Sequence, residues 1–252
     1  MKSNIFIFGL LLFSVSALGQ PNTSKIATPL IGDDAPSFTA QTTAGKLNFP
    51  NDFGTSWKIL FSHPKDYTPV CSSEIIQLAS MQDEFDKLGV KIAVISTDSI
   101  NQHHSWKKAL EEISYKGSPP VKINFPLIAD PNYAISVKYG MIHEKHNNSM
   151  DIRGVFIINP ENKICGIFFY PINVGRNLEE IKRTVIAMKT AGRDCVTPVN
   201  WKPGEDVMIP HFPYSDEELK ANPNLEKNYY NYGGFMWFKK QNEQENLTKQ
   251  GT

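Results

Sequence analysis

A short segment between an apolar run and a helical pattern is the most constraining feature of this sequence. Residues 57–61 are mostly apolar and are typical of a buried strand. In the helical pattern that follows, Thr68 suits the N-cap and Pro69 the first helical position. Cys71 then occupies the third position, where unpaired backbone N–H groups and the positive end of the helix dipole favour a thiolate. The segment predicts a reactive cysteine at a strand-to-helix turn, with the Thr68 hydroxyl within reach of the sulfur.

The position of Cys71 alone leaves a second interpretation open, because a single cysteine near a helix start is often a small buried apolar residue. The surrounding residues are more specific. Pro64-x-x-x-Thr68-x-x-Cys71 resembles the active-site signature of the peroxiredoxins. The longer stretch Ser-His-Pro-Lys-Asp-Tyr-Thr-Pro-Val-Cys, residues 62–71, resembles the one-cysteine subgroup of that family. The resemblance covers residues 30–192 and implies a thioredoxin-like fold and a thiol-dependent peroxidase.

The resemblance also implies roles for individual residues. Cys71 would attack hydrogen peroxide or an organic hydroperoxide and become a sulfenic acid. Thr68 would donate a hydrogen bond to the sulfur or the peroxide, and Pro64 would cover the thiolate. Arg153 matches the essential arginine of the family, whose charge would stabilise the thiolate and the developing negative oxygen. Peroxide and an external thiol reductant are then the expected small-molecule partners.

Three further residues match supporting positions of the family. Arg176, in Pro171-x-x-x-Gly175-Arg176, resembles the second arginine, and Glu74 resembles the acidic residue that orients an arginine. His63 distinguishes the one-cysteine subgroup, and a role near the sulfur is expected for it. A structural histidine is the alternative for His63.

Composition and the remaining cysteines exclude several other functions. The chain has 26 basic and 26 acidic side chains, so no nucleic-acid partner is expected. The three cysteines are too few for a disulfide scaffold, and no Cys-x-x-Cys occurs. Cys195 is either a resolving cysteine or a structural thiol, and Cys165, inside an apolar strand, is expected in the core. We expect no cofactor and no metal, because His143-x-x-His146 lacks a clear third ligand.

Alternating strand and helix patterns predict the fold class. Buried strands are expected at 57–62, 90–96 and 125–129, and helices at 69–88, 99–113, 132–139 and 177–192. Residues 153–158 and 164–169 are close enough in sequence to form an antiparallel hairpin, as are 37–42 and 45–49. These patterns predict an α/β protein with a mixed central sheet and helices on both faces.

The C-terminal part, residues 193–252, has a different character. Its prolines interrupt any long helix, and residues 228–238 are typical of an aromatic hairpin with a Gly-Gly turn. We expect these aromatic rings to pack on the main domain or on a partner subunit. Residues 197–204 resemble the C-terminal extension of one-cysteine peroxiredoxins, and the resemblance implies a homodimer.

The first 19 residues resemble a cleavable signal peptide. Lys2 precedes a short apolar run at 5–15, and Ala17-Leu18-Gly19 offers small residues for cleavage after Gly19. An exported protein, periplasmic or secreted, is therefore expected, with an uncleaved anchor as the alternative.

Two alternative functions remain open beside the one-cysteine peroxidase. A holdase or other binding protein could keep the fold without turnover, and a two-cysteine peroxidase could use Cys195 to resolve the sulfenic acid. A disulfide oxidoreductase is a weaker alternative, because the second cysteine of the Cys-x-x-Cys motif is absent.

Overall fold

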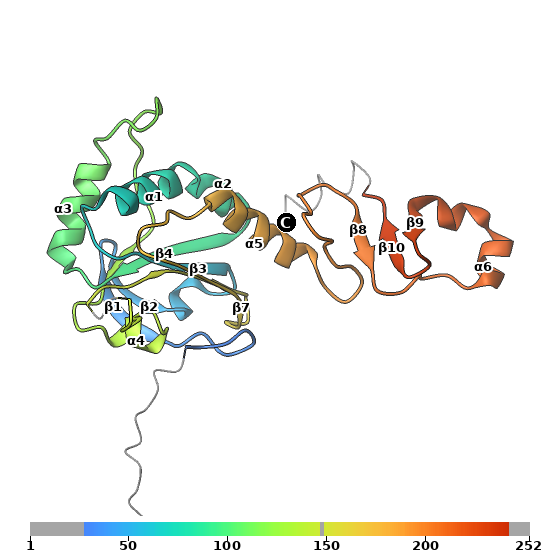
Figure 1. The fold of residues 1–252 in the computed structure, drawn as a ribbon, viewed down its shortest axis with the longest axis horizontal. Helices are drawn as coiled ribbons and strands as arrows, with labels where there is room; N and C mark the ends of the chain where they lie inside the picture. Colours follow the sequence, from blue (N-terminus) through green and yellow to red (C-terminus); the bar gives the residue numbers. More distant parts are fainter. Residues whose placement is uncertain (1–27, 147–148, 242–252) are drawn as a thin grey trace, which may run out of the picture.

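A computed structural model describes residues 28–146 and 149–241, so the expected signal peptide lies outside the described residues. The chain forms a seven-stranded sheet with flanking helices, followed by a smaller three-stranded sheet (Figure 1). No helix of the described part is long and apolar enough to cross a membrane.

The central sheet has the strand order β2-β1-β5-β4-β3-β6-β7. Its strands are β1 (Phe38–Thr42), β2 (Gly45–Phe49), β3 (Trp57–Ser62), β4 (Val90–Ser96), β5 (Leu127–Ala129), β6 (Arg153–Ile158) and β7 (Ile164–Tyr170). β3, β4 and β5 pair in parallel, and the hairpins β1–β2 and β6–β7 extend the sheet on either side in antiparallel fashion. The mixed sheet and both hairpins confirm the fold class expected from the sequence.

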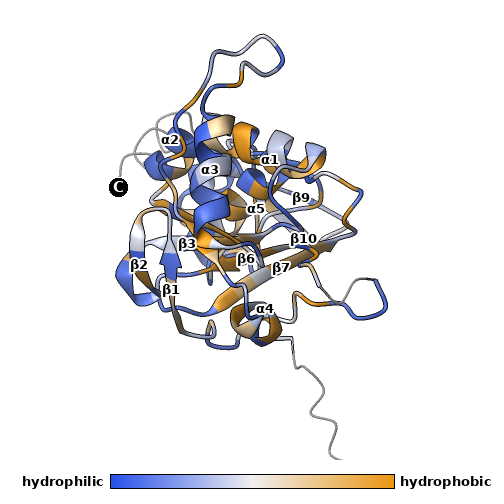
Figure 2. Ribbon diagram, turned by 90° about the vertical axis from the view of Figure 1, so that its left-hand side faces the viewer, coloured by the Kyte–Doolittle hydropathy of each residue, from blue (hydrophilic) through white to orange (hydrophobic). Residues whose placement is uncertain are grey.

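Helices lie on both faces of this sheet (Figure 1). They are α1 (Pro69–Ser80), α2 (Gln82–Lys87), α3 (Ile100–Leu110), α4 (Ala134–Lys138) and α5 (Leu178–Thr190), with a 3-10 turn at Asn51–Phe53. In Figure 2 the central strands are largely apolar, whereas the outer side of α3 is hydrophilic. Ser99 caps α3 and Asn177 caps α5, each accepting a hydrogen bond from a backbone N–H of the first turn.

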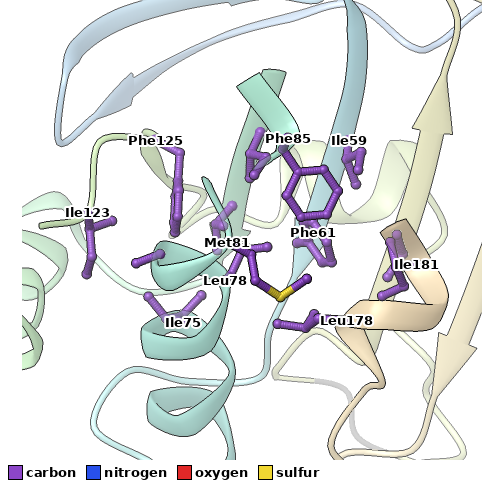
Figure 3. Packing of buried hydrophobic residues seen from close by; sticks show 14 of the residues in the cluster. Ile59, Phe61, Ile75, Leu78, Met81, Phe85, Ile123, Phe125, Leu178 and Ile181 are labelled. Carbon is purple, nitrogen blue, oxygen red and sulfur yellow. The ribbon is translucent and has the colours of Figure 1, made fainter. Parts of the chain in front are cut away.

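Alternation along the strands divides the buried residues into two cores. Ile59 and Phe61 of β3 face a core shared with α1, α2 and α5, whereas Leu60 between them faces the core that contains α4. Figure 3 shows the first core, with Met81 placed among side chains of α1, β3 and α5. This alternation also decides on which face Arg153, the first residue of β6, presents its side chain.

Two expectations of local structure were wrong. The helix expected at 69–88 is interrupted at Met81, whose N–H bonds to the Leu78 carbonyl at 3.1 Å in a tightened last turn. The interruption lets the Met81 side chain enter the core. Cys165 is only half-buried instead of lying in the core, because the register between β6 and β7 shifts from Ile157↔Gly166 to Ile158↔Ile164 and leaves Cys165 as the extra residue of a bulge.

The C-terminal residues form their own small sheet in the order β8-β10-β9. Its elements are β8 (Val207–Ile209), α6 (Asp216–Ala221), a 3-10 turn (Pro223–Asn228), β9 (Tyr229–Tyr232) and β10 (Met236–Lys239). Gly233 and Gly234, both with positive φ, make the expected turn between β9 and β10.

The aromatic rings of this hairpin were expected to pack on the main domain or on a partner subunit, and in the described part of the chain their ring contacts lie within residues 212–238. Trp237 stacks on Phe212 with ring centroids 4.2 Å apart, and Phe238 stacks on Tyr230 at 5.0 Å. The contact with the main domain is made elsewhere, by Trp201 and Val207 against the end of α5. The hairpin lies beyond this contact, away from the central sheet (Figure 1).

A buried carboxyl group without a hydrogen-bond partner lies just before β6. Asp151 is fully buried, and neither of its carboxyl oxygens has a partner among the described residues. The nearby Ser136 hydroxyl donates to Asp130 instead, at 2.7 Å. Burial raises the pKa of Asp151 well above its ordinary value, against a lowering by the Ser136 hydroxyl, and the charges of Asp130 and Asp98 raise it further. Asp151 is therefore protonated in the folded protein at a pH where it ionises in the unfolded chain.

This shift has a testable consequence for stability. The folded chain keeps a proton that the unfolded chain loses above about pH 4, so the Asp151 contribution to folding falls as the pH rises toward the folded-state pKa. Relative to Asp151→Asn, the wild type is expected to lose up to about 1.4 kcal/mol of unfolding free energy per pH unit in this window. Urea unfolding between pH 4 and 7 measures the difference. Asp83→Asn, at an exposed position, is the control; an equal slope in both variants would contradict the assignment.

Candidate active site

The N-terminus of α1 places Cys71 in the interior of the protein. Thr68 is the N-cap residue, with extended backbone angles (φ −91°, ψ 148°), and Pro69 is the first helical residue, as expected. Cys71 is the third helical residue and is fully buried. Its sulfur lies at a helix end whose unpaired N–H groups favour negative charge.

The Thr68 hydroxyl makes a different contact from the expected one. It donates to the backbone carbonyl of Lys65 at 2.9 Å and makes no side-chain cap. Tyr67, the residue directly before Thr68, has a φ of 59° and turns the chain sharply before the helix. The hydroxyl proton therefore holds this turn closed and is not directed at the sulfur.

Arg153 reaches Cys71 from β6. It shares a sheet face with Val155 and Ile157, which line the same core as the cysteine. Its Nη1 lies 3.2 Å from the Cys71 Sγ, and the residue is 2% exposed. Its Nε and Nη2 donate to the Ile172 carbonyl at 3.0 and 2.5 Å, which fixes the plane of the guanidinium. A rigid, desolvated positive charge thus faces the sulfur.

Glu74 joins the two buried arginines. Its Oε2 accepts from Arg153 Nη1 at 2.9 Å and from Arg176 Nη2 at 2.7 Å, and its Oε1 accepts from Arg176 Nε at 3.0 Å. One carboxylate between two guanidinium groups leaves the cluster with one excess positive charge. A negative charge on the Cys71 sulfur would neutralise that excess.

Glu74 itself is held in its charged form. Burial would raise the pKa of its carboxyl group, but the charge and hydrogen bonds of Arg176, together with the charge of Arg153, lower the pKa below the ordinary value. A carboxylate paired in this way orients both arginines without competing for a proton.

Arg176 also ties the strands around the site together. Its Nη1 donates to the carbonyls of Ser62 on β3 and Gly154 on β6, at 2.9 and 2.8 Å. Its guanidinium carbon lies 5.1 Å from the centre of the Phe61 ring. Arg176 therefore joins the end of β3, which leads into the loop before α1 and Cys71, to the start of β6, which carries Arg153.

His63 and Pro64 are buried at the end of β3. Neither ring nitrogen of His63 has a hydrogen-bond partner among the described residues, so no hydrogen bond joins His63 to Cys71. The ring packs on Trp106 with centroids 5.0 Å apart. Burial lowers the pKa of His63 to about 4, although the charge of Asp66 opposes this shift. The imidazole is therefore neutral at pH 7.

Cys195 lies at the other end of α5. The N-terminus of this helix follows Arg176, whereas Cys195 comes after its C-terminus and lies 3.1 Å from the Thr190 carbonyl. α5 has 13 residues, and a helix of that length spans about 20 Å. Cys71, Cys165 and Cys195 are all free thiols. Within one chain Cys195 is therefore far from the sulfur of Cys71.

Three residues that the sequence did not single out complete the site. The Ile172 carbonyl anchors Arg153. Ser62 donates its hydroxyl to the Ile152 carbonyl at 2.7 Å and accepts from the Gly154 N–H at 2.8 Å. A Cβ at Gly154 would lie 2.9 Å from the Ser62 Oγ, so glycine permits this approach. The glycine that follows Arg153 is the one feature of the sequence that could have indicated this close packing. The contact with the Ile172 carbonyl could not be predicted, because every residue type has a backbone carbonyl.

Comparison with known proteins agrees with this geometry. Residues 31–167 match the AhpC/TSA family, and residues 187–222 match the C-terminal domain of 1-Cys peroxiredoxin. A peroxiredoxin of Methanosarcina mazei is 49% identical over 201 residues, which cover 79% of this chain and 91% of that protein. Peroxiredoxin-6 of Gallus gallus is 42% identical over 198 residues, which cover 76% and 87% of the two chains.

Solved structures show the same relationship. A mutant of peroxiredoxin 6 from Arenicola marina superposes with a TM-score of 0.73 at 31% identity, over 85% of this chain and 99% of that one. A yeast mitochondrial 1-Cys peroxiredoxin superposes with a TM-score of 0.72 at 36% identity, over 84% of this chain and all of that one. The fold is therefore thioredoxin-like, as in these relatives. The chain belongs to the AhpC/TSA family of peroxiredoxins, as a thiol-dependent peroxidase that carries the C-terminal domain of the 1-Cys members.

Proposed function

We propose that the chain reduces hydrogen peroxide and organic hydroperoxides by a one-cysteine mechanism at Cys71. The contact between Arg153 and Cys71, inside a cluster with one excess positive charge, carries this proposal. The thiolate attacks the terminal oxygen of the peroxide and the O–O bond breaks. Cys71 becomes a sulfenic acid, and the alkoxide or hydroxide that leaves takes a proton to give an alcohol or water.

The neighbouring residues support this step in different ways. Arg153 stabilises the thiolate and then the charge that develops on the leaving oxygen. Glu74 and Arg176 position Arg153. Pro64 closes the site against bulk water. Thr68 holds the loop and, if its hydroxyl turns from the Lys65 carbonyl, donates to the peroxide.

An external thiol is the proposed reductant. It attacks the sulfenic sulfur and releases water, and a second thiol then breaks the mixed disulfide and regenerates Cys71. The separation of Cys195 from Cys71 along α5 supports this route over an intrachain disulfide. The yeast relative is described as resolved through glutathione and thioredoxin systems. Reductants of these two classes are therefore the first to compare in turnover assays.

Mass spectrometry after one equivalent of peroxide tests the one-cysteine mechanism. On a non-reducing sample we expect one added oxygen on Cys71, trapped by a sulfenic-acid reagent, and no Cys71–Cys195 disulfide. Cys195→Ser should then keep the wild-type rate of turnover with an external thiol. A Cys71–Cys195 disulfide, together with lost turnover in Cys195→Ser, would show a two-cysteine mechanism. Cys165→Ser is the matched control, since Cys165 is also a half-buried free thiol.

We further propose that the protein is an exported homodimer. The pattern of residues 1–19 supports export, and N-terminal sequencing of the protein from its native source would test cleavage after Gly19.

The match of residues 187–222 to the 1-Cys C-terminal domain supports a dimer. Sedimentation equilibrium would measure the assembly state, and a monomer at micromolar concentration would contradict it.

A further inference from the structure

A second cluster of chemically active side chains lies beside the peroxidase site. His63, Asp66 and His103 bring one possible ligand atom each to within 4.8 Å of the others. His63 Nε2 lies 3.6 Å from Asp66 Oδ1, and His103 Nδ1 lies 2.9 Å from Asp66 Oδ2. All three side chains are fully buried. Within residues 28–146 and 149–241, this is the one group of three such residues found so close together.

Half of the polar side-chain atoms of this cluster lack a partner in the described part of the protein. Both ring nitrogens of His63 and Asp66 Oδ1 lack hydrogen-bond partners among the described residues. Buried polar side-chain atoms are normally paired, so each exception calls for a missing partner. Here the unpaired atoms belong to residues of one cluster, and Nε2 of His63 faces Oδ1 of Asp66.

His103 is oriented as a metal ligand is. Its Nε2 lies 3.0 Å from the Ile128 carbonyl, which can only accept, so this nitrogen carries the proton. In the neutral ring Nδ1 is then a lone pair, and it faces the Asp66 carboxylate, another acceptor. Two acceptors at this distance need a proton or a cation between them. A ligating histidine commonly donates its other N–H to a backbone carbonyl in this way.

We infer that His63, Asp66 and His103 form a binding site for a first-row divalent metal ion of the Zn2+ class. Metal–ligand bonds of about 2.0–2.2 Å in a tetrahedral site separate neighbouring ligand atoms by about 3.3–3.6 Å. The separations of 2.9 and 3.6 Å run to different oxygens of Asp66, and one ligand atom from each residue lies within 4.8 Å of the others, so the side chains would have to draw together around an ion. Two imidazoles and one carboxylate suit zinc or iron(II), whereas calcium and magnesium prefer oxygen ligands alone.

The position of the site gives the metal a structural consequence. His63 follows β3, Asp66 lies in the loop before α1, and His103 lies on α3. The Asp66 N–H also donates to Asp98 Oδ2 at 2.8 Å, which holds the loop from a third direction. A bound ion would fasten the loop that carries Pro64 and Thr68 to α3. This inference stands whether or not the proposed one-cysteine mechanism holds.

Zinc binding to the full-length protein tests the site. The chelator-treated protein is equilibrated with Zn2+ over hours, because the ligands are buried, and dialysed before its zinc content is measured. We expect one tightly held ion per chain. In protein labelled with ¹⁵N-histidine, Zn2+ should shift the ring resonances of two of the six histidines, His63 and His103. No stoichiometric zinc, or shifts confined to other histidines, would overturn the inference.

Variants separate this site from other zinc ligands. His103→Gln should weaken zinc binding by about 100-fold or more, and Zn2+ should no longer raise its melting temperature. The double variant His143→Gln/His146→Gln and the variant Cys71→Ser should both bind as the wild type does. Undiminished binding in His103→Gln, or loss of binding in Cys71→Ser, would contradict the site. The resonance shifts in the wild type decide the question even if His103→Gln does not fold.

Discussion

Replacement of Cys71 by serine is expected to abolish thiol-dependent peroxide reduction, with a fall in kcat/KM of about 10⁴-fold or more. The serine hydroxyl stays protonated at neutral pH, so the site loses the anionic nucleophile that its excess positive charge favours. The fold should persist, because the hydroxyl fits the space of the thiol and can accept a hydrogen bond from Arg153 Nη1, which lies 3.2 Å from the sulfur. Peroxide consumption with an external thiol, beside thermal unfolding of the same preparation, measures both expectations.

The matched control is Cys165→Ser. Cys165 is half-buried at the β6–β7 bulge, and its thiol donates to the Lys163 carbonyl at 3.6 Å. Its replacement should leave turnover at the wild-type rate. If Cys71→Ser kept turnover, the peroxidase site would have to be elsewhere. If the wild type suppressed aggregation of other proteins without consuming peroxide, and Cys71→Ser did the same, the chain would be a binding protein that retains the fold.

The start of α1 could be predicted from the sequence because its signals are local. Thr68 and Pro69 suit the N-cap and the first helical position, and the structure places them there. The proximity of Arg153 to Cys71 could be predicted only from the family resemblance. Its physical basis is the two-residue period of β6, which sets Arg153 on the same face as Val155 and Ile157.

The details that sequence reasoning missed depend on contacts between distant segments. The Ile172 carbonyl orients Arg153, yet any residue type supplies a carbonyl. Asp66 and His103 are 37 residues apart and meet only because α3 packs over the loop after β3. The bulge at Cys165 depends on how β7 pairs with β6. The alternation of apolar and polar residues along β7 alone does not predict that pairing.

The aromatic hairpin shows the same limit on a larger scale. Its composition indicated that the rings pack on another surface, but not which one, and Tyr232 and Phe235 stay exposed. Trp237 of β10 stacks on Phe212 in the loop after β8, and Phe238 of β10 stacks on Tyr230 of β9, so both stacks lie within the C-terminal part of the chain. Ring stacking could therefore be expected from residue type, whereas the stacking partners required the three-dimensional arrangement.

Replacement of Arg153 by methionine is expected to lower kcat/KM for peroxide by about 10²–10³-fold, as loss of a charged donor to a developing oxyanion does. Methionine keeps much of the apolar volume of the side chain but removes the donor 3.2 Å from the Cys71 sulfur. Glu74 would then face Arg176 alone, and the pair would have no excess charge to favour the thiolate. Alkylation of Cys71 by iodoacetamide at pH 7 should slow in parallel, because the alkylating reagent attacks only the thiolate.

Two comparisons separate this electrostatic effect from a structural one. Arg153→Lys keeps a charge but not the planar set of donors that bonds Ile172, Glu74 and the sulfur together, so an intermediate loss is expected. Arg193→Met, at an exposed position, should have no effect. Glu74 remains paired with Arg176 through two hydrogen bonds to its side chain in every Arg153 variant, so the charge pair that joins α1 to the strand ends should survive. The contrary result would be normal peroxide turnover by Arg153→Met together with failure of Arg153→Lys to fold. Arg153 would then be a structural residue, and the charge balance around Cys71 would not explain the reactivity of Cys71.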